Sequence, residues 1–404
     1  MNGAGRVYDF WLVCTRCGTS HPALPLYQCR ACGGSLEVAY DYERIFSRLP
    51  FDRMSARTAS GIWKYRELLP VFPGTDPVTL GEGGTPLLPS WRMGSTEGGF
   101  QLYLKNESAN PTLAFKDRSL SVALTAARQF GMTEVVCAST GNTGVAAAAY
   151  AARAGLRCTV YIPATTPPEK LEAMKAYGAR LEMVSGSFSD AYATSADEAL
   201  RLGAFNLTST YLNPHAVEGN KTLAYEIFTS LQAVPDWIVI PVGAGPLLSG
   251  CYKGFREMLL AGVIDQLPRM VGVQASGCAP ILQAFEEGRQ EVRPWGGSTA
   301  TLASGIADPL STYPEDGTRT LAVIRESGGV AIGVSDLDMH HCRRMLAERE
   351  GILAELSSVT AVAAVKALYD SGAIRAGELV TAVVTGHGIK DMTAAINFEK
   401  TGVE

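Results

Sequence analysis

Three apolar runs of this chain each lead directly into a short turn rich in small residues. Residues 139–144, Ser-Thr-Gly-Asn-Thr-Gly, follow the run 134–138 and precede an alanine-rich stretch typical of a helix. Residues 241–250 follow the run 237–240, and residues 385–391 follow a third apolar run. A strand, a turn and a helix N-terminus leave backbone N–H groups pointing at an anion. We therefore predict an α/β fold with ligand sites at the carboxyl ends of its strands.

Apolar strand candidates alternate with amphipathic or alanine-rich stretches along most of the chain. This alternation predicts mainly parallel sheets with helices on both faces. A length of 404 residues is long for a single core and indicates two or three structural units. The strand candidates are 135–138, 158–162, 180–184, 238–242, 270–273 and 379–385.

One lysine stands out by its surroundings. Lys116 follows a turn and an apolar residue and precedes Asp117 and Arg118. Such a segment can hold an amine in an interior pocket, where desolvation lowers the pKa and makes the amine a nucleophile toward carbonyls. By themselves, however, Lys-Asp-Arg triplets are usually solvated helix starts.

Four of the nine cysteines form two C-x-x-C pairs near the N-terminus, Cys14 with Cys17 and Cys29 with Cys32. Two such pairs can place four thiolates around a tetrahedral Zn²⁺, and four sulfur ligands would make the metal structural. Two alternatives are a pair of disulfides and a ribbon without metal. His21 could be a substitute ligand. The remaining five cysteines lie in apolar or helical stretches, as inert buried thiols do.

Composition excludes several functional classes. With 47% apolar residues, 19% charged residues and a net charge of −5, the chain offers no basic surface for nucleic acid. Its first six residues lack the apolar segment of a signal peptide, and no apolar run reaches about 18 residues. We therefore expect a cytoplasmic protein without a membrane segment.

The motifs together resemble the threonine synthase family of pyridoxal-phosphate (PLP) enzymes, within the wider fold type II group. The matching segments span about residue 60 to residue 391. They are 81–87 (Gly-Glu-Gly-Gly-Thr-Pro-Leu), 110–112 (Asn-Pro-Thr), 115–118 (Phe-Lys-Asp-Arg), 139–142 (Ser-Thr-Gly-Asn), 213–222 and 385–391.

The resemblance implies a tryptophan synthase β-like fold of two three-layer α/β domains with the cofactor between them. Residues 128–212 would form the small domain, and residues 46–127 and 213–404 the large PLP-binding domain. Residues 1–45 would form the zinc ribbon that several family members carry. A homodimer is expected by the same resemblance.

The resemblance also implies a role for each motif. Lys116 would be the Schiff-base lysine and the acid and base that moves protons among substrate carbons. Asn142 would bind the ring hydroxyl, and Thr385 would face the pyridine nitrogen. The cofactor phosphate would be held at Gly243, Ala244, Gly245, Pro246 and Leu247. The substrate would be held at Ser139, Thr140, Gly141, Thr143, Asn213 and Lys221.

The implied reaction is elimination and replacement on an amino-acid side chain, namely O-phosphohomoserine plus water to threonine plus phosphate. Three departures from the family bear on the substrate. The phosphate loop, residues 242–250, lacks the family's asparagines and is closer to the form found in dehydratases. Ala216 stands where an arginine usually binds the substrate phosphate, a loss of roughly 2 to 5 kcal/mol. Leu113-Ala114 replaces the usual Gly-Ser.

Because of these departures, β-replacement or deamination of O-phosphoserine, serine or threonine, as in cysteate synthases or dehydratases, remains the alternative. A specialised biosynthetic role is also open. A non-catalytic protein that kept the fold would have no need of an aldimine lysine, and no P-loop or dinucleotide-binding motif occurs at a suitable strand end.

Overall fold

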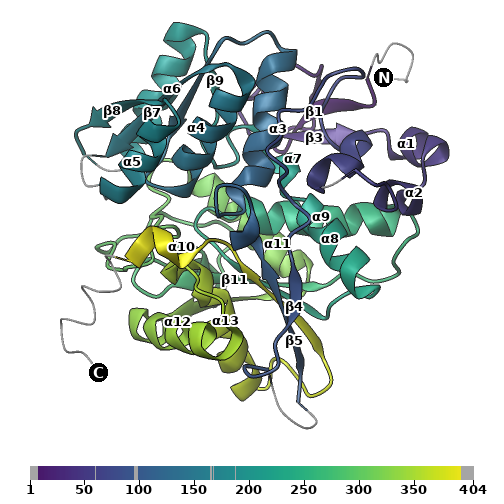
Figure 1. Ribbon diagram of the computed structural model, residues 1–404, viewed down its shortest axis with the longest axis vertical. Helices are drawn as coiled ribbons and strands as arrows, with labels where there is room; N and C mark the ends of the chain where they lie inside the picture. The colour runs from purple at the N-terminus through teal and green to yellow at the C-terminus, as the bar shows by residue number, and fades with distance from the viewer. Residues whose placement is uncertain are drawn as a thin grey trace. The chain divides into compact units, whose positions relative to one another are not determined.

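The computed structural model describes residues 8–59, 61–94, 99–163, 166, 168–186 and 188–392. Residues 1–6, on which the expectation of a missing signal peptide rests, lie outside this set. The chain forms two compact units. Unit 1 comprises Met1–Gly84, Lys116–Tyr225 and Lys253–Asp265, and unit 2 comprises Thr85–Phe115, Glu226–Tyr252 and Gln266–Glu404. Figure 1 shows the course of the chain.

Unit 1 contains two sheets. The first is antiparallel, with the order β2-β1-β3, and the second is parallel, with the order β8-β7-β6-β9. Its strands are β1 (Phe10–Cys14), β2 (Ser20–His21), β3 (Leu36–Tyr40), β6 (Glu134–Ala138), β7 (Arg157–Pro163), β8 (Arg180–Val184) and β9 (Phe205–Asn206). Its helices are α1 (Tyr42–Arg48), α2 (Phe51–Ser55), η1 (Gly61–Leu68), α3 (Lys116–Gln129), α4 (Asn142–Ala154), α5 (Pro168–Ala176), α6 (Phe188–Leu202) and α7 (Pro214–Gly219).

The parallel sheet of unit 1 is the middle of three layers, because side chains alternate between its two faces. Val135 and Cys137 of β6 pack into the apolar cluster that includes α3 and α4. Val136 and Ala138 pack with α6 on the other face. The predicted small domain, residues 128–212, contains this whole sheet, while its boundaries stay a prediction.

Unit 2 is built on one six-stranded sheet with the order β12-β11-β10-β13-β5-β4, in which only β4 is antiparallel to its neighbour. Its strands are β4 (Leu87–Pro89), β5 (Gln101–Asn106), β10 (Trp237–Pro241), β11 (Arg269–Ala275), β12 (Val330–Val334) and β13 (Leu379–Val384). Its helices are η2 (Glu107–Ala109), α10 (Pro280–Glu286), α11 (Pro314–Glu326), α12 (Asp336–Glu350), α13 (Leu356–Asp370) and η3 (Gly388–Asp391). Helices α8 (Thr222–Leu231) and α9 (Pro246–Leu260) contribute residues to both units.

This sheet also has helices on both faces. Val271 and Val273 of β11 join the core formed with α12 and α13. A side chain at Gly272, between them, would instead meet Ile324 of α11 and Leu248 of α9. The predicted α/β class and all six predicted strands are therefore confirmed. Within the described residues, no helix combines the length and apolarity needed to cross a bilayer.

Candidate functional site

Lys116 begins α3, and its amine lies at the carboxyl edge of the parallel sheet of unit 1. Its Nζ donates a hydrogen bond to Ser209 Oγ at 2.5 Å. The two charged residues that follow are completely buried, so α3 is not a solvated helix start. Arg118, for example, donates to Thr222 Oγ1 at 3.0 Å.

Ser209 follows β9, the strand beside β6. Leu207 N donates to Val136 O at 2.8 Å, and Ala138 N donates to Thr208 Oγ1 at 3.0 Å. These bonds keep the segment after β9 alongside the end of β6. The amine of Lys116 therefore reaches the edge at which the predicted turn 139–142 begins. Ser209 was missed from the sequence, although a run of hydroxyl residues after a strand of this sheet was a usable signal.

The turn between β6 and α4 is shaped by its own serine. Ser139 Oγ accepts from Gly141 N at 3.1 Å and from Gly144 N at 2.8 Å. The thirteen-residue helix α4 then starts at Asn142, and its N-terminus carries the positive end of the helix dipole. A methyl group placed on Gly141 would lie 3.2 Å from Lys170 Nζ. Lys170 is buried and adds a positive charge at this turn that the sequence did not reveal.

Two predicted substrate residues have partners inside unit 1. Asn213 Oδ1 accepts from His215 N and Ala216 N, and its Nδ2 donates to Asn206 O at 2.7 Å. These bonds cap α7 and tie it to β9. Contact of Asn213 with a substrate stays a prediction.

Lys221 is completely buried, and its Nζ lies 2.8 Å from a carboxylate oxygen of Glu218 and 2.8 Å from one of Glu257. It also lies over the ring of Tyr40. Two carboxylates already neutralise this ammonium. The prediction that Lys221 binds a substrate anion therefore loses its physical reason, and we leave Lys221 out of the proposed site.

In unit 2, the predicted phosphate turn joins β10 to α9. Gly245 has φ +99°, and a Cβ there would lie 2.2 Å from Thr320 Oγ1, so no other residue fits this backbone. Thr320 Oγ1 also donates to Ala244 O at 2.6 Å and fixes the turn. A Cβ on Gly243 would lie 3.4 Å from Asp308 Cβ, and α9 begins three residues later at Pro246. The turn therefore suits the close approach of an anion such as a phosphate to backbone.

Thr385 lies at the same edge of this sheet, because β13 pairs with β10 in parallel. Its hydroxyl lies 2.9 Å from Ser358 Oγ, which also accepts from Gly386 N at 2.7 Å. Ser358 thus orients Thr385 and was missed from the sequence. Phe115 N donates to Thr385 O at 3.0 Å. Phe115 is the residue that precedes Lys116 in the chain.

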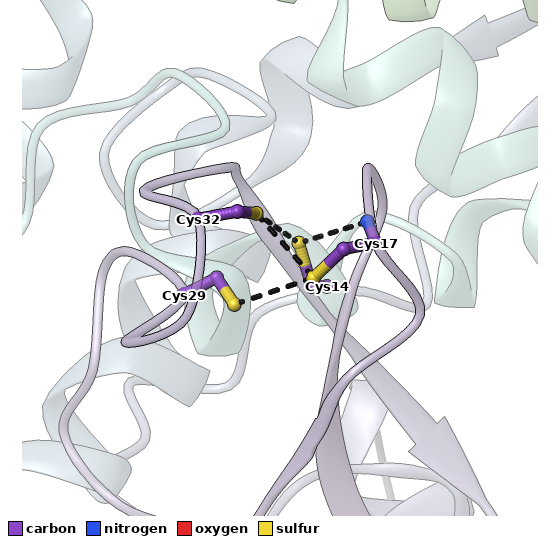
Figure 2. A group of neighbouring side chains, drawn as sticks. All are labelled: Cys14, Cys17, Cys29 and Cys32. Carbon is purple, nitrogen blue, oxygen red and sulfur yellow. Dashed lines mark hydrogen bonds between the residues drawn. The ribbon is translucent and has the colours of Figure 1, made fainter.

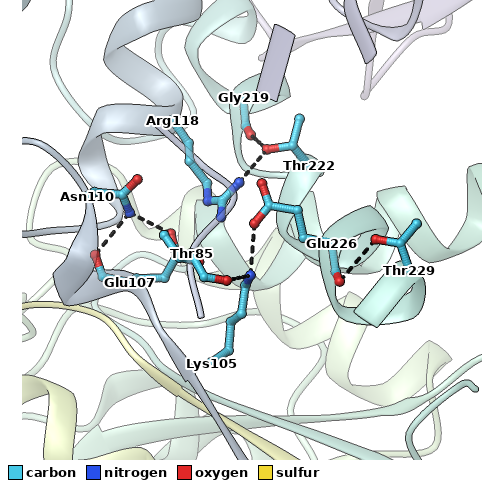
Figure 3. A network of polar contacts seen from close by, with 9 residues as sticks. All are labelled: Thr85, Lys105, Glu107, Asn110, Arg118, Gly219, Thr222, Glu226 and Thr229. Atoms are coloured by element: carbon cyan, nitrogen blue, oxygen red, sulfur yellow. Dashed lines mark hydrogen bonds and ion pairs between the residues drawn. The ribbon is translucent and has the colours of Figure 1, made fainter. Parts of the chain in front are cut away.

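A buried polar network in unit 2 fixes the segment that leads to Lys116 (Figure 3). Lys105 Nζ lies 2.8 Å from Glu226 Oε2 and donates to Thr85 O at 2.7 Å. Thr85 Oγ1 donates to Glu107 Oε1, and Asn110 Nδ2 donates to both the backbone and the carboxylate of Glu107 at 2.9 Å. The Asn-Pro-Thr motif is therefore anchored by paired charges that are out of contact with solvent.

The four predicted metal ligands come together in unit 1 (Figure 2). Their sulfur atoms all lie within 4.8 Å of one another, and Sγ distances of 3.4 Å (Cys14–Cys32), 3.7 Å (Cys17–Cys29) and 3.4 Å (Cys17–Cys32) are among them. Zinc–sulfur bonds of about 2.3 Å in a tetrahedron give sulfur–sulfur distances of about 3.8 Å. All four cysteines are free thiols, so the structure does not pair them as disulfides.

The cysteine cluster therefore fits a structural zinc. Hydrogen bonds from the Thr19 hydroxyl and backbone lower the pKa of Cys17 to about 6, which favours the thiolate that a metal binds. His21 Nε2 lies 3.2 Å from Cys29 Sγ. With four sulfurs present, His21 is placed to support a ligand rather than to replace one.

Comparison with known proteins adds to this geometry. The family model described as "Pyridoxal-phosphate dependent enzyme" matches residues 78–386. Threonine synthases of Methanocaldococcus jannaschii and Methanosarcina acetivorans are each 38% identical, over 95% and 96% of this chain and 93% and 94% of theirs. A threonine synthase of Mycobacterium tuberculosis is 36% identical over 82% of this chain and 89% of its own.

Solved structures are similar in fold. A maize serine racemase has a TM-score of 0.66 at 22% identity, covering 78% of this chain and 92% of its own. The processed form of threonine deaminase isoform 2 from Solanum lycopersicum also has a TM-score of 0.66, at 21% identity, covering 79% and 88%. These similarities confirm the fold type II architecture.

Proposed function

Because the chain belongs to the family of pyridoxal-phosphate-dependent enzymes, and within it to the threonine synthases, we propose that it converts O-phosphohomoserine and water into threonine and phosphate. It is a PLP-dependent lyase of amino-acid biosynthesis. When bound, PLP draws electrons from the substrate carbons and makes their protons and leaving group labile. The remaining chemistry is proton transfer and anion binding, which the protein's own side chains and backbone supply.

One observation carries the assignment of Lys116. Its Nζ meets Ser209 at the edge where the turn 139–142 begins, while the preceding residue, Phe115, is hydrogen-bonded to Thr385. The peptide bond between Phe115 and Lys116 therefore ties together two of the predicted cofactor contacts. In this proposal Lys116 attaches the cofactor, and its released amine then moves protons between substrate carbons. Ser209 holds that amine in place.

The other cofactor contacts divide by chemistry. Asn142 would donate to the ring hydroxyl of the cofactor, and the neutral hydroxyl of Thr385, which lies beside Ser358, would face the ring nitrogen. The cofactor phosphate would be held by backbone N–H groups of the turn between β10 and α9 and by the positive end of the fifteen-residue helix α9. Gly243, Ala244, Gly245, Pro246 and Leu247 form that turn and the start of the helix.

We assign the substrate carboxylate to the start of α4, with Thr140, Gly141 and Thr143 as contacts. Ser139 shapes the turn with its side chain. The substrate phosphate needs a cation, and Ala216 is packed in the apolar cluster of α3 and α4 rather than open to a ligand. We assign Lys170, whose amine lies at Gly141, as the cation that binds the substrate phosphate.

The rival function is β-replacement or deamination of an O-phosphoserine-type substrate. It is favoured by Leu113, a non-glycine residue with φ +61° that is 37% exposed three residues before Lys116. Leu113 stands where the family usually has a glycine, and this departure in the segment before Lys116 is what keeps the rival substrate class open. We further propose a cytoplasmic homodimer.

The test is an absorbance titration of the purified protein with O-phosphohomoserine and, separately, with O-phosphoserine, while phosphate and threonine are measured. We expect visible absorbance from the bound cofactor, a spectral change with O-phosphohomoserine, and equal release of phosphate and threonine. Lys116→Ala should lose activity by about 10³-fold or more. Lys366→Ala, which removes an exposed lysine paired with Asp370, should retain it. A response to O-phosphoserine alone would move the assignment to the rival.

A further inference from the structure

The N-terminal ribbon is joined to the reactive amine of Lys116 by a continuous chain of short contacts inside unit 1. We propose that Tyr27, in the loop between the two cysteine pairs, is a positioning residue for Lys116. Through it the ribbon holds the segment after β9, and with it Ser209, in register with the lysine. This inference rests on the proposed function of Lys116 and adds to it a role for the ribbon.

The first contact is made by the phenol of Tyr27. Its Oη accepts a hydrogen bond from Asn206 N at 2.6 Å, and its ring packs on Phe205 with centroids 5.9 Å apart. Strand β9 consists of these two residues, and among the described strands it pairs only with β6. A two-residue strand has few bonds of its own to fix its position. Tyr27 thus supplies both a hydrogen-bond acceptor and an apolar ring to β9, the edge strand of this sheet.

The second contact passes through Asn206, which is buried. Its Oδ1 accepts from Thr208 N at 2.9 Å, and its backbone O accepts from Asn213 Nδ2 at 2.7 Å. Thr208 in turn accepts from Ala138 N, next to the turn that begins at Ser139. A shift of Asn206 would therefore be passed directly to Ser209, the hydrogen-bond partner of Lys116 Nζ.

The ribbon is also held against the same region at a second point. His215 Nε2 donates to Leu24 O at 3.2 Å, and the His215 ring packs on Phe130 with centroids 5.3 Å apart. Tyr27 lies two residues before Cys29, so the cysteine cluster restricts the loop that carries it. By fixing this loop, the four cysteines would fix the position of Tyr27, and through β9 the position of Ser209 beside Lys116.

The variant Tyr27→Phe keeps the ring and removes the acceptor for Asn206 N. We expect faster amide exchange over residues 206–209 and a shift in the pH titration of the cofactor's visible absorbance. We also expect a fall of about tenfold in kcat, because small displacements of a reacting group are costly. A purely structural tyrosine would lower the melting temperature without moving the pH titration.

Tyr42→Phe is the matched control. Tyr42, at the start of α1, also loses one hydrogen bond, at 2.7 Å to Glu257, but that bond leads to α9 and not to β9. The proposal is overturned if Tyr27→Phe gives the same exchange over 206–209 and the same pH titration as the unmodified enzyme, or if Tyr42→Phe changes both to the same extent as Tyr27→Phe. Phosphate release from the unmodified enzyme is a separate readout. Its absence would overturn the proposed reaction, while the exchange and absorbance measurements would still decide the role of Tyr27.

Discussion

The proposed ligand contacts at the carboxyl ends of the strands differ between the sheet of unit 2 and the parallel sheet of unit 1. In unit 2 the turn after β10 presents its backbone and tolerates only glycine at Gly245. In unit 1 the edge of β6 and β9 is shaped by side chains, as Lys116 meets Ser209 and Lys170 lies at Gly141. Anion binding by backbone needs an unobstructed approach, whereas proton transfer needs a mobile titratable group held by a partner.

The largest effect is expected at the backbone-made edge. Gly245→Ala would place Cβ 2.2 Å from Thr320 Oγ1 at φ +99°. Strain and clash together should cost roughly 3 kcal/mol, expressed as a loss of cofactor affinity of about 100-fold or more. Equilibrium dialysis of PLP measures this. Gly74→Ala is the control, because Gly74 has a similar φ of +79° with open space around it, and it should leave cofactor affinity unchanged.

Acid should weaken unit 1 in particular. Burial lowers the pKa of His215 from 6.5 to about 4, so the unfolded chain binds its proton at a higher pH than the native protein does. His215 therefore contributes fully above pH 6.5, and its contribution declines as the pH falls to 4. The free energy of unfolding should drop by about 3 kcal/mol over this window.

Urea unfolding at several pH values measures this slope. Replacing the imidazole in His215→Gln should flatten it, while His341→Gln, which changes an exposed side chain, should not. An unchanged slope in His215→Gln would show that other groups govern acid unfolding.

A smaller effect is expected at the side-chain-made edge. Ser209→Ala removes the hydrogen-bond partner of Lys116 Nζ without disturbing the backbone bonds after β9. We expect kcat to fall about tenfold, with cofactor affinity nearly unchanged. Steady-state kinetics and PLP dialysis on the same preparation separate the two quantities. A large loss of affinity with normal kcat would contradict the division between the two edges.

The smallest effect concerns the backbone of Leu113. Its φ of +61° is unfavourable for a leucine, and Leu113→Gly should raise the free energy of unfolding by about 0.5 kcal/mol. Gln232→Gly, at an exposed position with φ +53°, should give a similar gain. If Leu113→Gly instead lowers stability, its side chain makes contacts that outweigh the backbone strain.

The same contrast explains what the sequence could predict. Apolar runs fully buried in parallel sheets, such as those of β6 and β10, predicted the strands correctly. Gly245 marked its turn because its conformation excludes other residues, and two C-x-x-C pairs marked the metal cluster. These features could be predicted because the residues that define each of them lie close together in the sequence.

Contacts between distant segments left no such signal. Ser209 lies 93 residues from Lys116, and Ser358 lies 27 residues from Thr385. Lys221 sat in a matching motif, but only the fold revealed that Glu257, 36 residues away, helps to neutralise it. Burial and charge pairing of this kind depend on tertiary packing, so local patterns do not predict them.

In the proposed function, Lys116 is the residue to which the cofactor attaches. Reduction of the holoenzyme with sodium borohydride, followed by proteolysis and peptide mass spectrometry, tests it most directly. We expect one modified lysine, Lys116, carrying the mass of the reduced cofactor. Attachment to another lysine, or to none in a protein with bound PLP, would contradict it.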